Sequence, residues 1–267
     1  MSVNLFSTIE DFQHRLFTAE GVVHPANENY ADDSIIPLYP LTSSFHEEST
    51  AAFDLLNSIY CFKITDNQFK GIVANLGIQD LESGEALAKL MREKQSSYEL
   101  LKKKFLTIIS KFMRDSDYTI HDIYMGGRNQ ATSTIDFGRP EKKKIGFHYD
   151  NWGDLPVSQL NESTNRLCIN LGKGHRYFLF IDKTIFEMRE ELMRSDLRYG
   201  ELEDSNELGK LYIKNADPAS YKVMSVRLEP FEGYIAPTET IMHDGANFDS
   251  EHIDIQLTAR GLFHPEL

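Results

Sequence analysis

The stretch Gly146-Phe147-His148-Tyr149-Asp150-Asn151-Trp152-Gly153-Asp154 carries two side chains of the kinds that bind transition metals. His148 and Asp150 are two residues apart, and because side chains alternate between the faces of an extended strand, both point to the same side. An imidazole nitrogen and a carboxylate oxygen held in this way supply two of the three protein ligands of a 2-His-1-carboxylate site. Such a site needs a second histidine from elsewhere, and therefore a rigid scaffold that brings separated segments together.

Short strands separated by turns dominate the sequence around this stretch, from residue 118 almost to the end. Leu167, Ile169 and Leu171 alternate with other residues, and a similar alternation returns at residues 224–228 and 252–260. One helix interrupts the series near Ile185, and an acidic loop at residues 200–207 is expected to be exposed. This pattern predicts a mainly β protein with helices, of the α+β class, built as a jelly-roll or cupin-like barrel over residues 118–267.

The first 117 residues have a different character. We expect a short helix near residues 9–17, a helix from about Glu47 to Ile59, and a longer helix over residues 81–113. The last of these has an apolar stripe at helical spacing, formed by Tyr98, Leu101, Phe105, Ile108 and Phe112. Residues 1–117 are therefore predicted to form an irregular and helical region that packs outside the barrel, with both parts in one compact domain.

Composition argues against several classes of function. The 267-residue chain has a net charge of −13, which disfavours binding to nucleic acid or to an anionic membrane surface. Its densest basic run, Lys142-Lys143-Lys144, is interpreted as a solvated loop edge. Cys61 and Cys168 form no metal-binding or disulfide pattern, and the N-terminus lacks the features of a signal peptide. No apolar run is long enough to cross a membrane, and we therefore expect a cytoplasmic protein. We also expect it to be a monomer or a homodimer.

The second histidine is expected to be His243, which ends an extended segment shortly before Gly245. The strand that follows has two different faces: alternate residues from Ile253 to Ala259 are apolar, whereas those from His252 to Arg260 are polar. His252 is the alternative to His243 as a ligand. An arginine at the end of the polar face could pair with both oxygens of a carboxylate.

The order of these residues resembles that of the iron(II)/2-oxoglutarate-dependent oxygenases. In that superfamily an H-x-D motif is followed after a long gap by a histidine and then by an arginine on the next strand. The matching positions here are His148, Asp150, His243 and Arg260, although the last spacing is longer than usual. The resemblance covers roughly residues 118–263 and identifies no subfamily.

The resemblance implies a double-stranded β-helix that binds Fe(II) through His148, Asp150 and His243, with 2-oxoglutarate and O2 as co-substrates. It places the distal carboxylate of 2-oxoglutarate on Arg260, with help from Thr258 and Tyr124. Because halogenating members replace the carboxylate ligand by a small residue, the presence of Asp150 favours hydroxylation or another C–H oxidation. The implied protein is a dioxygenase, an oxidoreductase that acts on a small molecule such as an amino acid or a specialised metabolite.

Three further residues are candidates for binding the substrate. Arg128 and Arg166 could hold a substrate carboxylate, and Trp152 could line the mouth of the pocket; surface ion pairs and packing explain these residues equally well. Asp244 could orient His243.

Two other functions stay open. One is a cupin-like metal-dependent isomerase or dioxygenase without 2-oxoglutarate, although such sites commonly carry an H-x-H pair and this chain has H-x-D. The other is a non-catalytic binding barrel.

Overall fold

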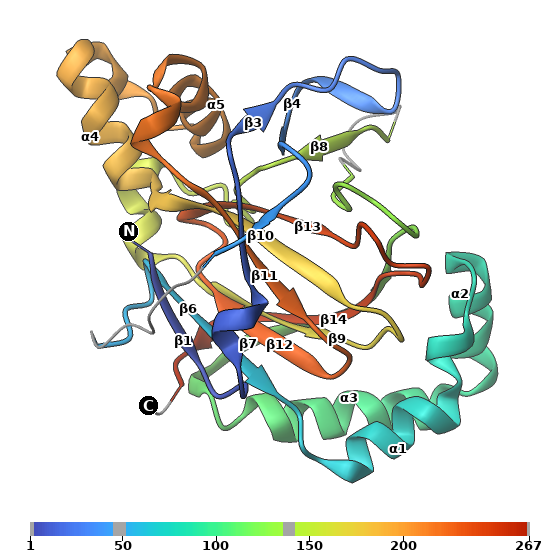
Figure 1. Ribbon diagram of the computed structural model, residues 1–267. Helices are drawn as coiled ribbons and strands as arrows, with labels where there is room; N and C mark the ends of the chain where they lie inside the picture. Colours follow the sequence, from blue (N-terminus) through green and yellow to red (C-terminus); the bar gives the residue numbers. More distant parts are fainter. Residues whose placement is uncertain (1–2, 45–51, 136–141, 266–267) are drawn as a thin grey trace.

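The strands of this protein form two main sheets that face each other across an apolar interior (Figure 1). The computed structural model describes residues 3–44, 52–135 and 142–265. The larger sheet has the strand order β1-β6-β12-β9-β14-β7. Its members are β1 (Asn4–Ser7), β6 (Ser58–Lys63), β12 (Glu232–Ala236), β9 (Asn165–Asn170), β14 (Ile255–Phe263) and β7 (Met113–Met125). Neighbouring strands are antiparallel, except that β1 and β6 are parallel.

The second main sheet has the order β13-β10-β11-β2-β5, and a smaller sheet has the order β3-β4-β8. The members of the second sheet are β13 (Ile241–Ala246), β10 (Arg176–Thr184), β11 (Val223–Leu228), β2 (Leu16–Ala19) and β5 (Thr42–Ser43). The smaller sheet consists of β3 (Val22–Val23), β4 (Tyr30–Pro37) and β8 (Lys144–Gly146). A β-bridge between His148 and His243 joins the segment after β8 to β13.

Helices cover the outer side of each main sheet. Helices α1 (Asn67–Leu76), α2 (Gly84–Glu93) and α3 (Gln95–Ile109) pack on the larger sheet, and α4 (Ile185–Ser195) and α5 (Ser205–Asn215) pack on the second. The 3-10 helices are η1 (Phe12–Arg15), η2 (Ile78–Asp80), η3 (Val157–Glu162), η4 (Leu197–Glu201) and η5 (Pro218–Ser220). The result is a mixed α+β protein with four layers, two of sheet between two of helix.

The alternation of side chains along each strand explains this layering. In β10, Phe178 and Phe180 point into the interior between the sheets, whereas Leu179 and Ile181 pack on the other side, in the same cluster as residues of α4 and α5. In β14, alternate apolar residues such as Leu257 lie in the cluster under α1–α3. The polar face of that strand is therefore left to the interior, as its sequence pattern indicates.

The N-terminal part differs from the sequence prediction. No α-helix forms over residues 9–17, where the short 3-10 helix η1 and strand β2 lie instead, and residues 58–63 form β6 rather than the end of a helix. The start of that expected helix, at residues 47–51, lies outside the described residues. Its apolar spacing was misleading because Ala52, Leu55 and Leu56 precede β6, whereas Ile59 belongs to a strand that is buried on both faces from Ser58 to Phe62.

The strands near the N-terminus also bear on the predicted division of the chain. Residues 4–63 contribute strands to both main sheets, and β7 runs across position 117. The helical region therefore begins only at α1 and ends before β7. The division into residues 1–117 and 118–267 stays a prediction.

Two further boundaries shift for local reasons. The helix expected over residues 81–113 is divided into α2 and α3 at Lys94, and its stripe from Tyr98 to Ile108 is buried. The expected acidic loop at residues 200–207 contains η4 and the start of α5, because the Asp204 side chain accepts a hydrogen bond from the Glu207 amide and so caps the helix. Helix α4, expected near Ile185, is confirmed and begins with a Thr184–Glu187 capping box.

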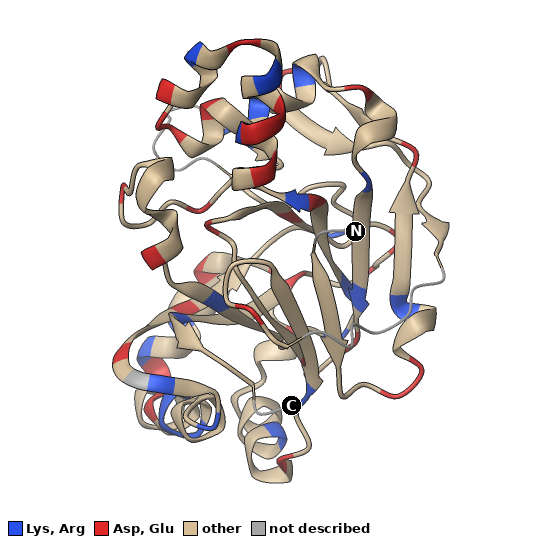
Figure 2. Ribbon diagram, turned by 90° about the vertical axis from the view of Figure 1, so that its left-hand side faces the viewer, with Lys and Arg blue, Asp and Glu red and all other residues tan. Residues whose placement is uncertain are grey.

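The helices carry residues of both charge signs. In the view of Figure 2, Lys and Arg are interspersed with Asp and Glu on the helices at the top and bottom, whereas the sheets between them are mostly uncharged. None of the helices in the described ranges is both long enough and apolar enough to cross a bilayer.

Candidate metal centre

Backbone hydrogen bonds hold the H-x-D segment against β13. The His148 amide donates to the His243 carbonyl at 3.0 Å, and the His243 amide donates to the His148 carbonyl at 2.9 Å. The two histidines are thus directly opposed residues of an antiparallel pair, and their side chains leave the pair on the same side. The Asp150 amide donates to the Thr238 carbonyl at 3.0 Å, which fixes the third residue.

A glycine allows this segment to reach its place. Gly146 has a φ of +68°, and a Cβ atom there would lie 2.0 Å from the carbonyl oxygen of Ile35 in β4. Any other residue would clash with that backbone and adopt a strained conformation. Gly146 therefore sets the approach of β8 to β4 and, two residues later, the position of His148.

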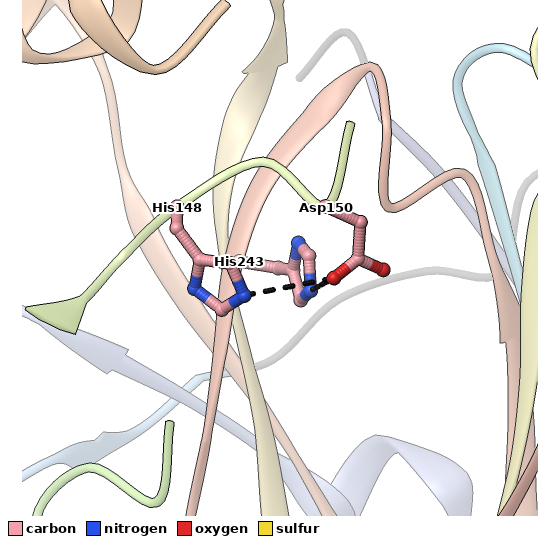
Figure 3. A group of neighbouring side chains, drawn as sticks. All are labelled: His148, Asp150 and His243. Atoms are coloured by element: carbon pink, nitrogen blue, oxygen red, sulfur yellow. Dashed lines mark ion pairs between the residues drawn. The ribbon is translucent and has the colours of Figure 1, made fainter. Parts of the chain in front are cut away.

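The three side chains converge on one point (Figure 3). Asp150 Oδ1 lies 3.6 Å from His148 Nε2 and 3.7 Å from His243 Nε2. Their ligand atoms all lie within 4.8 Å of one another, and within the described ranges this is the one such cluster of His, Cys, Asp or Glu that the structure contains. The arrangement resembles the 2-His-1-carboxylate facial site.

The remaining ring nitrogens are occupied in a way that suits metal binding. His148 Nδ1 lies 2.8 Å from the Gly146 carbonyl, and His243 Nδ1 lies 3.2 Å from the Ile241 carbonyl. A ring whose Nδ1–H donates to a carbonyl presents the lone pair of Nε2. His243 Nε2 is buried and has no hydrogen-bond partner. A bound metal ion would satisfy this orphaned atom, so the donor set fits Fe(II).

The electrostatics of the site keep Asp150 ionised. Burial alone would raise the pKa of Asp150, but the Arg166 guanidinium and the two imidazoles hold it below its ordinary value. Burial lowers the pKa of His243 to about 3, so this ring is neutral near pH 7. Burial also acts to lower the pKa of His148, but the Asp150 carboxylate beside it produces a net rise.

Arg166 is the partner of the Asp150 carboxylate. Its Nη2 lies 2.9 Å from Asp150 Oδ1 and 2.8 Å from Oδ2. The Arg166 guanidinium also lies 5.9 Å from the centre of the Trp152 ring, which packs against His121 at 4.9 Å. Arg166 therefore positions the Asp150 carboxylate of the triad, and its expected role in binding the substrate stays a prediction.

A cavity of about 330 Å³ opens in front of His148 and Asp150. Both side chains line it, as do four residues expected from the sequence, namely Tyr124, Trp152, Arg166 and Thr258. Tyr124 and Trp152 are 41% and 47% exposed, and they are the two exposed aromatic side chains among the described residues. The cavity thus has a polar interior beside the triad and an aromatic rim.

Two expected residues have partners away from this cavity. Arg260 pairs with the buried Glu239, with Nη2 3.2 Å from Oε1, and its Nε donates to Thr164 Oγ1 at 2.5 Å. Arg128 is exposed and pairs with Glu82. Neither arginine lines the cavity.

The structure corrects two interpretations of residues near the site. Asp244 does not contact the His243 ring; its carboxylate accepts hydrogen bonds from Thr132 and Thr134. Lys144, interpreted as part of a solvated run, lines the cavity. Strand alternation could not have shown this, because Gly146, with a φ of +68°, interrupts the extended backbone between Lys144 and His148.

No protein-family model matches the chain, and no curated protein does. Among solved structures, two crystal structures of the Kdo hydroxylase KdoO, a non-haem Fe(II) alpha-ketoglutarate-dependent dioxygenase, match it. The complex with cobalt(II) has a TM-score of 0.44 at 12% identity, and the complex with succinate and Fe(III) has 0.39 at 15%. Each match covers 82% of this chain and 88% of the KdoO chain. Because a fold alone does not imply a function, the function of this chain depends on the residues of its site.

Proposed function

We propose that this protein is a non-haem Fe(II)/2-oxoglutarate-dependent oxygenase that oxidises an unactivated C–H bond of a small molecule. The observation that carries the proposal is the convergence of His148, Asp150 and His243 on one point beside a cavity, with Nε2 of His243 buried and unpartnered. The two facing sheets, with the H-x-D segment paired to β13, support a double-stranded β-helix as the fold.

Each protein group has a defined task in this proposal. Backbone carbonyls occupy both Nδ1 atoms, so each histidine in its neutral form presents Nε2 as the donor, and Asp150 offers an anionic oxygen that Arg166 keeps ionised. Fe(II) held there, with 2-oxoglutarate and O2, would supply the oxidising chemistry of the class. The presence of Asp150 favours hydroxylation or a related oxidation over halogenation.

The cavity supports a small-molecule substrate. Its volume of about 330 Å³ lies at the lower end of the usual range for such sites. Trp152 and Tyr124 offer exposed aromatic faces at its rim, where a ring or an apolar chain of the substrate would pack. An amino acid or a specialised metabolite would fit this description.

Anaerobic titration of the metal-free protein with Fe(II), followed by 2-oxoglutarate, tests the proposal. We expect one Fe(II) per chain, and a visible charge-transfer band that needs both additions. His243→Ala should lose both, whereas His252→Ala, which removes an exposed histidine, should keep both. Metal binding without the band would favour the cupin-like function, and no metal binding would leave a non-catalytic barrel.

A further inference from the structure

The arginines near the metal centre are already paired with carboxylates. Arg166 pairs with Asp150, and Arg260 pairs with Glu239. Arg176, at the start of β10, pairs with Asp254 through an Nε–Oδ1 contact of 3.0 Å, with side chains only 2% and 1% exposed. When a buried carboxylate already neutralises an arginine, a second anion at the same arginine would be an uncompensated negative charge. Such an arginine is therefore a poor binding site for another carboxylate.

Lys144 is the cation in this region whose contacts are with neutral groups. It lies in β8, four residues before His148, and its side chain lines the same cavity as His148 and Asp150. Within the described residues, its Nζ donates to Gln130 Oε1 and lies 5.8 Å from the centre of the Tyr30 ring. An ammonium group has three N–H donors, so donors remain for a ligand.

The surroundings of Lys144 suit an anion. The side chain is half-buried, and burial lowers the pKa of Lys144 while the charge of Asp244 partly offsets this. Asp244 acts only through space, since its oxygens accept hydrogen bonds from Thr132 and Thr134. A partly desolvated ammonium is stabilised by a carboxylate placed against it.

Neutral hydrogen-bonding groups complete the cavity wall. Side chains with hydroxyl or amide groups line it together with Lys144, namely Tyr124, Gln130, Ser133, Thr134, Gln256 and Thr258. A carboxylate that enters the cavity therefore meets Lys144 and several neutral donors, beside the Arg166 guanidinium that is already paired with Asp150.

We propose that Lys144, rather than Arg260, receives the distal carboxylate of the 2-oxoacid co-substrate. The inference rests on the proposed function and assigns a residue within it. A 2-oxoacid would lie between the metal-binding triad and Lys144, both of which line the cavity. Thr258 and Tyr124 keep their expected supporting role, because both line the cavity.

The test compares two ligands that differ only at the distal end. 2-Oxopentanoate carries a methyl group where 2-oxoglutarate carries its second carboxylate. Calorimetry on the Co(II)-loaded protein, without turnover, should show that wild-type protein prefers 2-oxoglutarate by about 10- to 100-fold, as expected for a hydrogen bond between charged groups.

The variants then locate the source of this preference. Lys144→Met should abolish it and leave 2-oxopentanoate binding unchanged, and Lys144→Arg should restore part of it. Lys142→Met removes the same charge from an exposed position two residues earlier and should keep the preference. Thermal melting of each variant checks that it is folded.

Each remaining outcome contradicts a different statement. If Lys144→Met keeps the preference, or Arg260→Met abolishes it, the assignment to Lys144 is wrong. If wild-type protein binds both oxoacids with equal affinity, no cation of the chain binds the distal carboxylate, and the assignment to Lys144 is also wrong. If Co(II)-loaded wild-type protein binds neither oxoacid, the proposed function itself is wrong.

Discussion

At the scale of single residues, the metal centre depends on how each ligand is oriented. Both histidines use the carbonyl two residues before them, Gly146 for His148 and Ile241 for His243, to occupy Nδ1. The same local hydrogen bond, from Nδ1–H to the carbonyl two residues earlier, therefore sets the tautomer of both rings. Asp150 is oriented by a side chain from another strand, Arg166, so its geometry depends on the tertiary structure.

Removing Arg166 should weaken metal binding without removing a ligand. We expect Arg166→Met to lower Co(II) affinity by about 10- to 100-fold, because partners that orient a ligand commonly contribute this much. Arg166→Lys should recover part of the loss. Arg128→Met, which removes an exposed arginine paired with Glu82, is the control and should bind Co(II) like the wild type. Equal affinities in a calorimetric titration of Arg166→Met and wild type would contradict the positioning role.

Gly146 should be far less tolerant of substitution than a glycine in open space. Gly146→Ala should lower the free energy of unfolding by about 2–4 kcal/mol, because its Cβ meets the Ile35 carbonyl and its φ is positive. Gly84→Ala, at the first position of α2 with nothing within 4 Å of the new Cβ, should be neutral or slightly stabilising. Urea denaturation measures both. A loss in Gly146→Ala no larger than in Gly84→Ala would show that β8 can move away from β4.

At the scale of elements, α3 shows how a helix is fixed to the sheet beneath it. Leu101 and Phe105 are fully buried in the cluster that also contains Leu257 and Ala259 of β14. The opposite face of β14 carries Thr258, which lines the cavity. The packing of α3 therefore supports, from behind, the strand that forms part of the site.

Two adjacent leucines of α3 make a matched test of this packing. Leu101→Ala should lower the free energy of unfolding by about 2–5 kcal/mol, since a fully buried side chain leaves a cavity. Leu100→Ala, which removes a side chain that is 52% exposed, should change it by less than about 0.5 kcal/mol. Similar losses for the two variants in urea denaturation would mean that α3 is not docked through this face.

At the scale of the whole molecule, the triad joins the H-x-D segment, which follows β8, to β13 of the second sheet. A metal ion held by all three residues would tie these segments together and would bind only the folded chain. Folding and metal binding would then be linked.

This linkage predicts a metal-dependent stability. At a free Co(II) concentration about 100 times its Kd, the free energy of unfolding should rise by about 2.7 kcal/mol. Asp150→Ala should lose this gain, and removal of the metal with a chelator should reverse it in the wild-type protein. Thermal melting with and without Co(II) measures the effect. An equal rise in Asp150→Ala would place the metal at another site.

Local patterns predicted the parts of the fold that depend on neighbouring residues. The alternation in β9, β11 and β14, the stripe of α3 and the start of α4 all follow from the period of a strand or a helix. The N-terminal strands were missed because β6 is buried on both faces within the larger sheet, so its sequence carries no alternation. Helix α5 was missed because Asp204 looks like a loop residue until its capping role is seen.

The sequence by itself determined the identity of the three converging side chains, since the H-x-D spacing and the place of His243 before Gly245 are local features. Only the tertiary structure decided which cations are neutralised. Arg260 meets Glu239 and Arg166 meets Asp150, whereas Lys144, among the residues that the structure describes, meets the neutral Gln130 and Tyr30. Ion pairing depends on distances between residues that are far apart in the chain, and no periodicity in the sequence encodes those distances.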